Sequence, residues 1–150
     1  MSIEADLEQI LETAHFWNWL PDWGIVKEIH SKIPNSYSVL TPFAFAYLEE
    51  LIRSMTTDYE YGIVDRSGNP RKVKVGINLV NMAIDENKGN PELILLLENI
   101  KPRFAISKLS DKGDNRNSVA HGYIHPRFWD ENSFESLIHD IATLSRHAGF

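Results

Sequence analysis

Apolar residues recur every three or four positions along most of the chain, which is the spacing of one face of an α-helix. In the first segment they fall at Ile3, Leu7, Ile10, Ala14 and Trp17. This pattern predicts a first helix over residues 2–19, which Pro21 would end. Asp22 can cap a short second helix that runs to about Lys32.

The most apolar stretch of the chain follows a proline turn. Thr41-Pro42 has the residues of a helix start, with threonine as the N-cap and proline at the first helical position. From Phe43 to Met55 the chain is apolar on nearly all sides. We therefore expect residues 43–55 to form the central and most buried helix.

Three further helices are predicted in the second half. Residues 76–88 carry an apolar face, and Asn90-Pro91-Glu92 has the cap and first-turn residues of another helix, which extends to Ile100. The last helix is expected to begin near Asn132 or Ser133. Its core face would be Phe134, Leu137, Ile138, Ile141 and Leu144.

Residues 59–75 do not follow the helical pattern. Turn residues over 65–70 separate two short arms, 59–64 and 71–75, that are rich in tyrosine, valine and isoleucine. These arms predict a hairpin or an extended excursion. The sequence as a whole predicts an all-α fold: one domain over residues 1–150, a bundle of about five helices, with a short hairpin-like insertion at 59–75.

Composition narrows the class of protein. The 150 residues suit one domain, and 43% hydrophobic and 24% charged residues are ordinary for a globular chain. The chain contains no cysteine, which removes disulfides and thiolate sites and fits a reducing compartment. The N-terminus lacks the pattern of a secretory signal, and no apolar run approaches the roughly 20 residues of a membrane span. We expect a cytoplasmic protein without membrane contact.

The net charge of −6 opposes binding of nucleic acid through the overall field of the protein. Any RNA contact would need a local basic patch or a specific site. The densest basic cluster is Arg66, Arg71, Lys72 and Lys74, within the predicted insertion. It is either a solvated hairpin or an arm that contacts phosphates.

Candidate chemistry gathers just before the last helix, in residues 114–126. Arg116, Asn117 and His121 form an Arg-Asn-x-x-x-His segment, and Gly122 follows the histidine directly. This segment resembles the signature of the HEPN ribonucleases, which is an arginine, a polar residue and then a histidine, late in a small helical bundle. The sequence is therefore identified as similar to that family over these few residues.

The chemistry of these residue types agrees with RNA cleavage that uses no metal ion. Histidine titrates near neutrality and can act as general base or acid, and arginine presents a fork that fits phosphate oxygens. Asn117 would orient His121 or the phosphate. The resemblance implies Arg116, His121 and Asn117 as catalytic residues, no cofactor, and a product with a 2′,3′-cyclic phosphate.

The resemblance also implies partners. On an ideal helix Arg116 and His121 are about 140° apart. They would converge through the reach of arginine, a bent helix start, or a second copy of the chain. HEPN ribonucleases pair about a two-fold axis, so a homodimer with an RNA substrate is expected. Members act in bacterial defence or as toxins, which implies an inhibitory antitoxin or other protein partner. Asn115, Tyr123 and His125, close to the motif, are further candidates for RNA contact.

Other interpretations stay open. Arg116 could pair with Asp114 or another carboxylate, Asn117 could be a helix cap, and His121 a half-buried structural histidine. The chain would then be a non-catalytic HEPN-like module that binds a protein partner, a nucleotide or RNA, or a helical scaffold without a ligand.

A metal site is not expected. His121 and His125 have the spacing of two zinc ligands on one helical face. However, Gly122 and Pro126 disfavour a continuous helix through both histidines, and no third ligand follows at a suitable spacing.

Overall fold

The computed structural model describes residues 2–62 and 64–150, and for Tyr61 it describes the backbone alone. The α-helices are α1 (Ile3–Thr13), α2 (Leu20–Lys32), α3 (Tyr37–Ser54), α4 (Thr57–Tyr61), α5 (Gly76–Glu86), α6 (Pro91–Ile100), α7 (Arg116–Ala120) and α8 (Glu131–Ser145). Two 3₁₀ turns, η1 (Lys101–Phe104) and η2 (Pro126–Phe128), complete the described elements. The predicted all-α class is confirmed.

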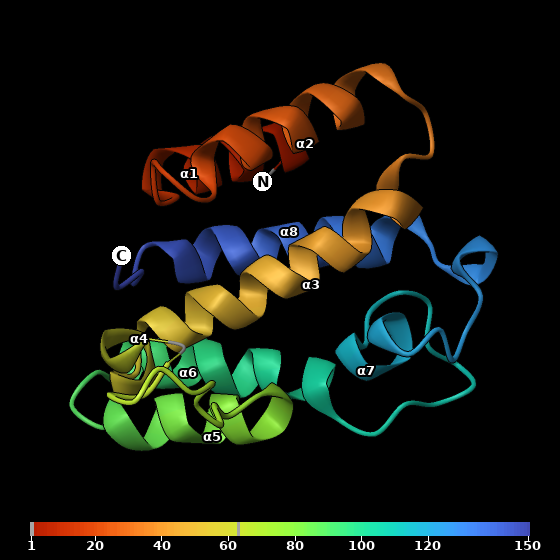
Figure 1. Cartoon of the computed structure of the whole chain (residues 1–150). Coiled ribbons are helices and arrows are strands. Elements are labelled where there is room, and N and C mark those ends of the chain that lie inside the picture. The colour runs from red at the N-terminus through yellow and green to blue at the C-terminus, as the bar shows by residue number, and fades with distance from the viewer. Residues whose placement is uncertain (1, 63) are drawn as a thin grey trace.

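Helices α3 and α8 lie side by side through the middle of the molecule (Figure 1). Helices α1 and α2 lie on one side of this pair, and α5 and α6 lie on the other (Figure 1). Helix α1 packs on α8, while α5 packs on α3 and α6. The short helix α7 lies at one end of the bundle and contacts α3.

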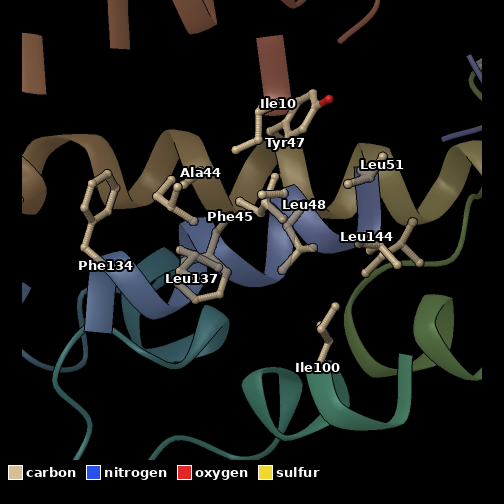
Figure 2. Packing of buried hydrophobic residues seen from close by; sticks show 14 of the residues in the cluster. Ile10, Ala44, Phe45, Tyr47, Leu48, Leu51, Ile100, Phe134, Leu137 and Leu144 are labelled. Atoms are coloured by element: carbon tan, nitrogen blue, oxygen red, sulfur yellow. The ribbon is translucent and has the colours of Figure 1, made fainter. Parts of the chain in front are cut away.

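The core forms where these layers meet. Figure 2 shows side chains from α3 and α8 packed together, with Ile10 reaching in from α1 and Ile100 from α6. Every residue of the core face predicted for the last helix is buried. Helix α3 is apolar on most of its sides, and it packs against α2 through Trp23 as well as against α5. Across the described residues, no helix combines the length and apolar character needed to cross a bilayer.

The predicted boundaries of the first two helices were wrong. Helix α1 ends at Thr13, and Trp17, which the pattern placed on its core face, is 75% exposed. Pro21 lies in the first turn of α2 instead of ending α1. The backbone N–H groups in the first turn of a helix have no acceptor within the helix, so proline, which lacks this group, fits there. A proline can therefore begin a helix as well as end one. The predicted end at Lys32 is confirmed.

Helix α3 begins at Tyr37, four residues before the predicted cap, and Pro42 lies inside it. Leu40 and Thr41 are buried, and the Thr41 hydroxyl donates to the Tyr37 carbonyl at 2.7 Å. The free energy gained by burying this extra turn offsets the free energy lost with the backbone hydrogen bond that the proline cannot make.

Helix α8 also begins earlier than predicted, at Glu131. Its cap is Asp130, whose Oδ1 accepts the Ser133 N–H at 2.7 Å, and not Asn132. Hydrogen bonds from the Ser133 side chain and backbone hold the pKa of Asp130 below its usual range. Asp130, Asn132 and Ser133 are all good N-cap residues, so sequence alone could not select one.

The insertion at 59–75 is only partly a hairpin. Tyr59 lies in α4, not in an extended arm, and Ile63 lies outside the described residues. The predicted turn is present: Asp65 Oδ1 accepts the backbone N–H groups of Ser67 and Asn69, and these bonds lower the pKa of Asp65. One antiparallel bridge joins Val64 to Pro70, and within the described segment no strand extends it.

Candidate functional site

The candidate motif folds into helix α7, whose start is fixed by Asn115. The Asn115 side chain is an N-cap: its Oδ1 accepts the Ser118 N–H at 2.9 Å, and its Nδ2 donates to the Ala105 carbonyl at 2.9 Å. The residue is 5% exposed. Asn115 therefore holds α7 against the end of η1, and the cap is Asn115 instead of Asn117.

The end of α7 is fixed by Gly122, which adopts a φ of 62°. The Tyr123 N–H donates to the Ser118 carbonyl at 3.0 Å, and the Gly122 N–H donates to the Val119 carbonyl at 3.4 Å. This pair of bonds is a Schellman motif, which needs a left-handed residue after the cap. The motif ends the helix at Ala120 and leaves His121 as its C-cap.

His121 is exposed to solvent. Within residues 2–62 and 64–150, no side-chain hydrogen bond or ion pair holds its imidazole ring. The ring is thus accessible to a ligand, and the interpretation of His121 as a half-buried structural histidine does not fit this placement.

Arg116, the first residue of α7, turns toward the central helix α3. Its Nε and Nη2 donate to Oε2 of Glu49 at 3.1 and 2.9 Å. The Glu49 side chain is 14% exposed and that of Arg116 is 20% exposed. Arg116 therefore pairs with a carboxylate 67 residues earlier in the chain, and not with Asp114, whose Oδ1 accepts the Lys112 N–H.

Asn117 connects this ion pair to the segment before α7. Its Oδ1 accepts from Arg116 Nη1 at 3.3 Å, and its Nδ2 donates to the carbonyls of Ala105 at 3.1 Å and Phe104 at 3.4 Å. Asn117 orients the arginine, whereas the sequence interpretation had it orient His121 or the phosphate. Arg116 and Asn117 are held inward on one side of α7, and His121 is free at its end.

The residues after His121 form a basic and aromatic surface. Tyr123 and Phe128 are 54% and 56% exposed, and the Arg127 guanidinium lies 4.6 Å from the centroid of the Phe128 ring. His125 is exposed, and its Nδ1 accepts the Arg127 N–H at 3.1 Å. We call Tyr123, His125, Arg127 and Phe128 the 123–128 surface.

The basic residues of the insertion differ in availability. Arg66, Lys72 and Lys74 are exposed. Arg71 instead makes an ion pair with Asp58 and donates to the Gly62 carbonyl at 2.8 Å, so it ties the insertion to α4.

A polar cleft of about 740 Å³ lies beside α7, between residues 102–115 and the first turns of α8. Arg103 in its wall donates to Asp140 at 2.7 Å and to Ser136 at 2.9 Å. The cleft is lined by Asn115 but by none of Arg116, Asn117 and His121. The motif therefore lies outside this cleft.

The two histidines of the segment are not on one helical face, because Gly122 turns the chain between them. Nowhere in the described chain do three or more His, Asp or Glu side chains gather as a metal site would require.

Two features of the site escaped sequence analysis. Glu49 lies far from the motif in sequence. The sequence indicates its role only in that it is a charged residue within the most apolar helix. Arg127 and Phe128 lie close to the motif, and the alternation of basic and aromatic residues there could have indicated a nucleic-acid surface.

Comparison with known proteins provides no relatives. No protein-family model, no curated protein and no solved structure matches this chain.

Proposed function

We propose that this protein is a metal-independent endoribonuclease of the HEPN type, with Arg116 and His121 as its working pair and Asn117 in support. The observation that carries the proposal is the form of α7. One ordered five-residue helix presents an exposed, unengaged His121 at its end and a fixed Arg116 at its start.

The proposed reaction transfers the RNA backbone phosphate within the substrate. The 2′-hydroxyl oxygen attacks the adjacent phosphorus, the bond from phosphorus to the 5′ oxygen breaks, and the product ends are a 2′,3′-cyclic phosphate and a 5′-hydroxyl. His121 serves as the general base that takes the 2′ proton or as the acid that protonates the 5′ oxygen. Arg116 stabilises the charge that develops on the phosphate oxygens.

The placement of the two side chains favours a homodimer. Arg116 turns toward α3 while His121 is exposed at the other end of α7, so a second copy would bring one protomer's His121 to its partner's arginine. The 123–128 surface would contact single-stranded RNA, because exposed aromatic rings stack on bases and arginine pairs with phosphate. A role in bacterial defence or as a toxin, with an inhibitory antitoxin in the cytoplasm, completes the proposal.

The test is cleavage of single-stranded RNA in excess EDTA by the wild-type protein and by Arg116→Ala and His121→Ala. His139→Ala serves as the matched control, since it removes an exposed histidine of α8 that lies outside the motif and the 123–128 surface. We expect the wild type and the control to produce cyclic phosphate ends, and the two motif variants to lose activity. Expression of the wild type should also slow bacterial growth, and His121→Ala should relieve that effect.

A second candidate is a non-catalytic HEPN-like module that binds a protein partner, a nucleotide or RNA. The Glu49–Arg116 pair and the net charge of −6 favour this candidate with a protein partner, because a paired arginine in an acidic protein attracts phosphate weakly. If the wild type cuts no better than the motif variants on varied RNAs, this second function replaces the first.

A further inference from the structure

Glu49 holds Arg116 with a geometry that fixes the orientation of the guanidinium. One oxygen of the carboxylate accepts both Nε–H and Nη2–H, at 3.1 and 2.9 Å. Two bonds from a planar group to a single acceptor restrain rotation about the last bonds of the arginine side chain. Both side chains are mostly buried, so water screens this pair less than a surface pair.

The other oxygen of Glu49 is also engaged. Its Oε1 accepts the backbone N–H of Gly76 at 2.7 Å, at the start of α5. The carboxylate is therefore itself held in place, between α3, which carries it, and the start of α5, which follows the 59–75 insertion. An anchored carboxylate can orient its partner, whereas a mobile one would follow it.

The contacts continue through Asn117 to the Ala105 carbonyl. Gly76, Glu49, Arg116, Asn117 and Ala105 thus form one hydrogen-bonded chain across four parts of the fold. In this chain three N–H groups of Arg116 are used, two by Glu49 and one by Asn117.

The engaged groups leave donors for a ligand. Each terminal nitrogen of the guanidinium carries a second N–H group, and among the described residues neither of these has an acceptor. An arginine held in this way keeps N–H groups that can donate to phosphate oxygens.

We infer that Glu49 is a positioning residue of the proposed site, which orients the Arg116 guanidinium toward the phosphate and itself touches no RNA. This inference rests on the proposed function. It predicts that loss of the Glu49 charge slows the chemical step and not RNA binding, because the arginine would keep its charge and lose its fixed direction.

The experiment compares the wild type with Glu49→Gln, Glu49→Asp and Glu50→Gln. Glu50 is the matched control, since it is the next residue of α3 and pairs with Arg53 and not with the motif. For RNA cleavage by Glu49→Gln we expect kcat to fall about tenfold or more, with KM changed less than about twofold. Glu49→Asp keeps the charge and should restore part of kcat, and Glu50→Gln should behave as the wild type.

A second measurement does not depend on activity. In NMR spectra of protein with ¹⁵N-labelled arginine, the Arg116 Nε–H should exchange slowly with water in the wild type and rapidly in Glu49→Gln. Slow exchange in both proteins, or rapid exchange in both, would overturn the positioning of Arg116 by Glu49. So would cleavage by Glu49→Gln at the wild-type kcat.

The two proposals fail in different ways. If the wild type cleaves RNA and Glu49→Gln cleaves it equally well, the ribonuclease proposal stands and the role of Glu49 is wrong. If the wild type cleaves no RNA, the ribonuclease proposal and the catalytic part of this inference are both wrong. The exchange rates still decide whether Glu49 fixes Arg116.

Discussion

The central helix pair and the end that carries α7 are held together by different forces. Helices α3 and α8 contribute most of the fully buried apolar side chains, including Leu48 and Leu137. Residues 101–130 bury few apolar side chains, and they fold around bonds from asparagine, aspartate and tryptophan side chains to the backbone.

Because of this difference, most of the stability of the protein and its candidate site reside in different parts of the molecule. Burial of apolar surface supplies most of the free energy of folding, and it is concentrated in α3 and α8. Segments with few buried apolar contacts open at lower free energy than the core. The α7 end can therefore be altered with modest loss of global stability, and substitutions there report on the site more than on folding.

The largest loss of stability is expected from a truncation in the central pair. Leu48 is fully buried between the layers, so Leu48→Ala should lower the free energy of unfolding by about 2–5 kcal/mol. Urea denaturation followed by circular dichroism measures this change. A loss below about 1 kcal/mol would contradict the account of α3 as the centre of the core.

A smaller loss is expected at Gly113, near the site. Its φ is 90°, and an added Cβ would lie 2.9 Å from Trp129 Cβ. Gly113→Ala should cost on the order of 1–3 kcal/mol, from backbone strain and the clash together. Gly122→Ala is the control, because that residue has a φ of 62° but open space around its Cβ position. In thermal melts the midpoint temperature of Gly113→Ala should be lower than that of Gly122→Ala. The reverse order would show that the contact with Trp129 is unimportant.

The cap of α7 should contribute about 0.5–2 kcal/mol, as N-caps generally do. Asn115→Ala removes both the cap and the bond to the Ala105 carbonyl, whereas Asn115→Ser keeps a capping oxygen and loses that bond. Chemical denaturation should rank the wild type first, then Asn115→Ser, then Asn115→Ala. Equal stability of all three proteins would mean that α7 does not depend on its cap.

The smallest effect is a pH dependence at Asp130. Its pKa is lowered in the folded protein, so its contribution is present above the ordinary carboxyl pKa of about 4 and is lost as pH falls through the folded value. The side chain is 39% exposed, so solvent limits this effect. Asp130→Asn keeps a capping oxygen without titration and should lose less stability in acid than the wild type. Denaturation at pH 7 and pH 3 compares the two proteins, and parallel losses would rule out the Asp130 contribution.

The sequence predicted the fold class well because helical periodicity is a local signal. The core face of α8, from Phe134 to Leu144, could be predicted in full because each of its positions follows the helical repeat. Helix boundaries were less predictable. Trp17 continued the apolar repeat beyond the true end of α1, and Pro42 suggested a start inside α3. In these places tertiary packing outweighed local preference.

The site was predictable in its residue types but not in its contacts. The motif residues share one short segment, so a local pattern could indicate them. The partner of Arg116 is Glu49, which only the fold brings near. A local pattern also could not assign the capping role to Asn115 instead of Asn117, since both residues are asparagine, a good N-cap.

The most direct test of the account measures activity and stability on the same samples of wild type and His121→Ala. His121 is exposed, and its side chain makes no hydrogen bond or ion pair within the described residues, so its removal should leave the thermal midpoint unchanged. If His121 carries general acid–base catalysis, the rate of RNA cleavage should fall by about a hundredfold or more. Equal cleavage by both proteins, or a loss of activity that only follows a loss of folded protein, would contradict the claim that α7 is the working site.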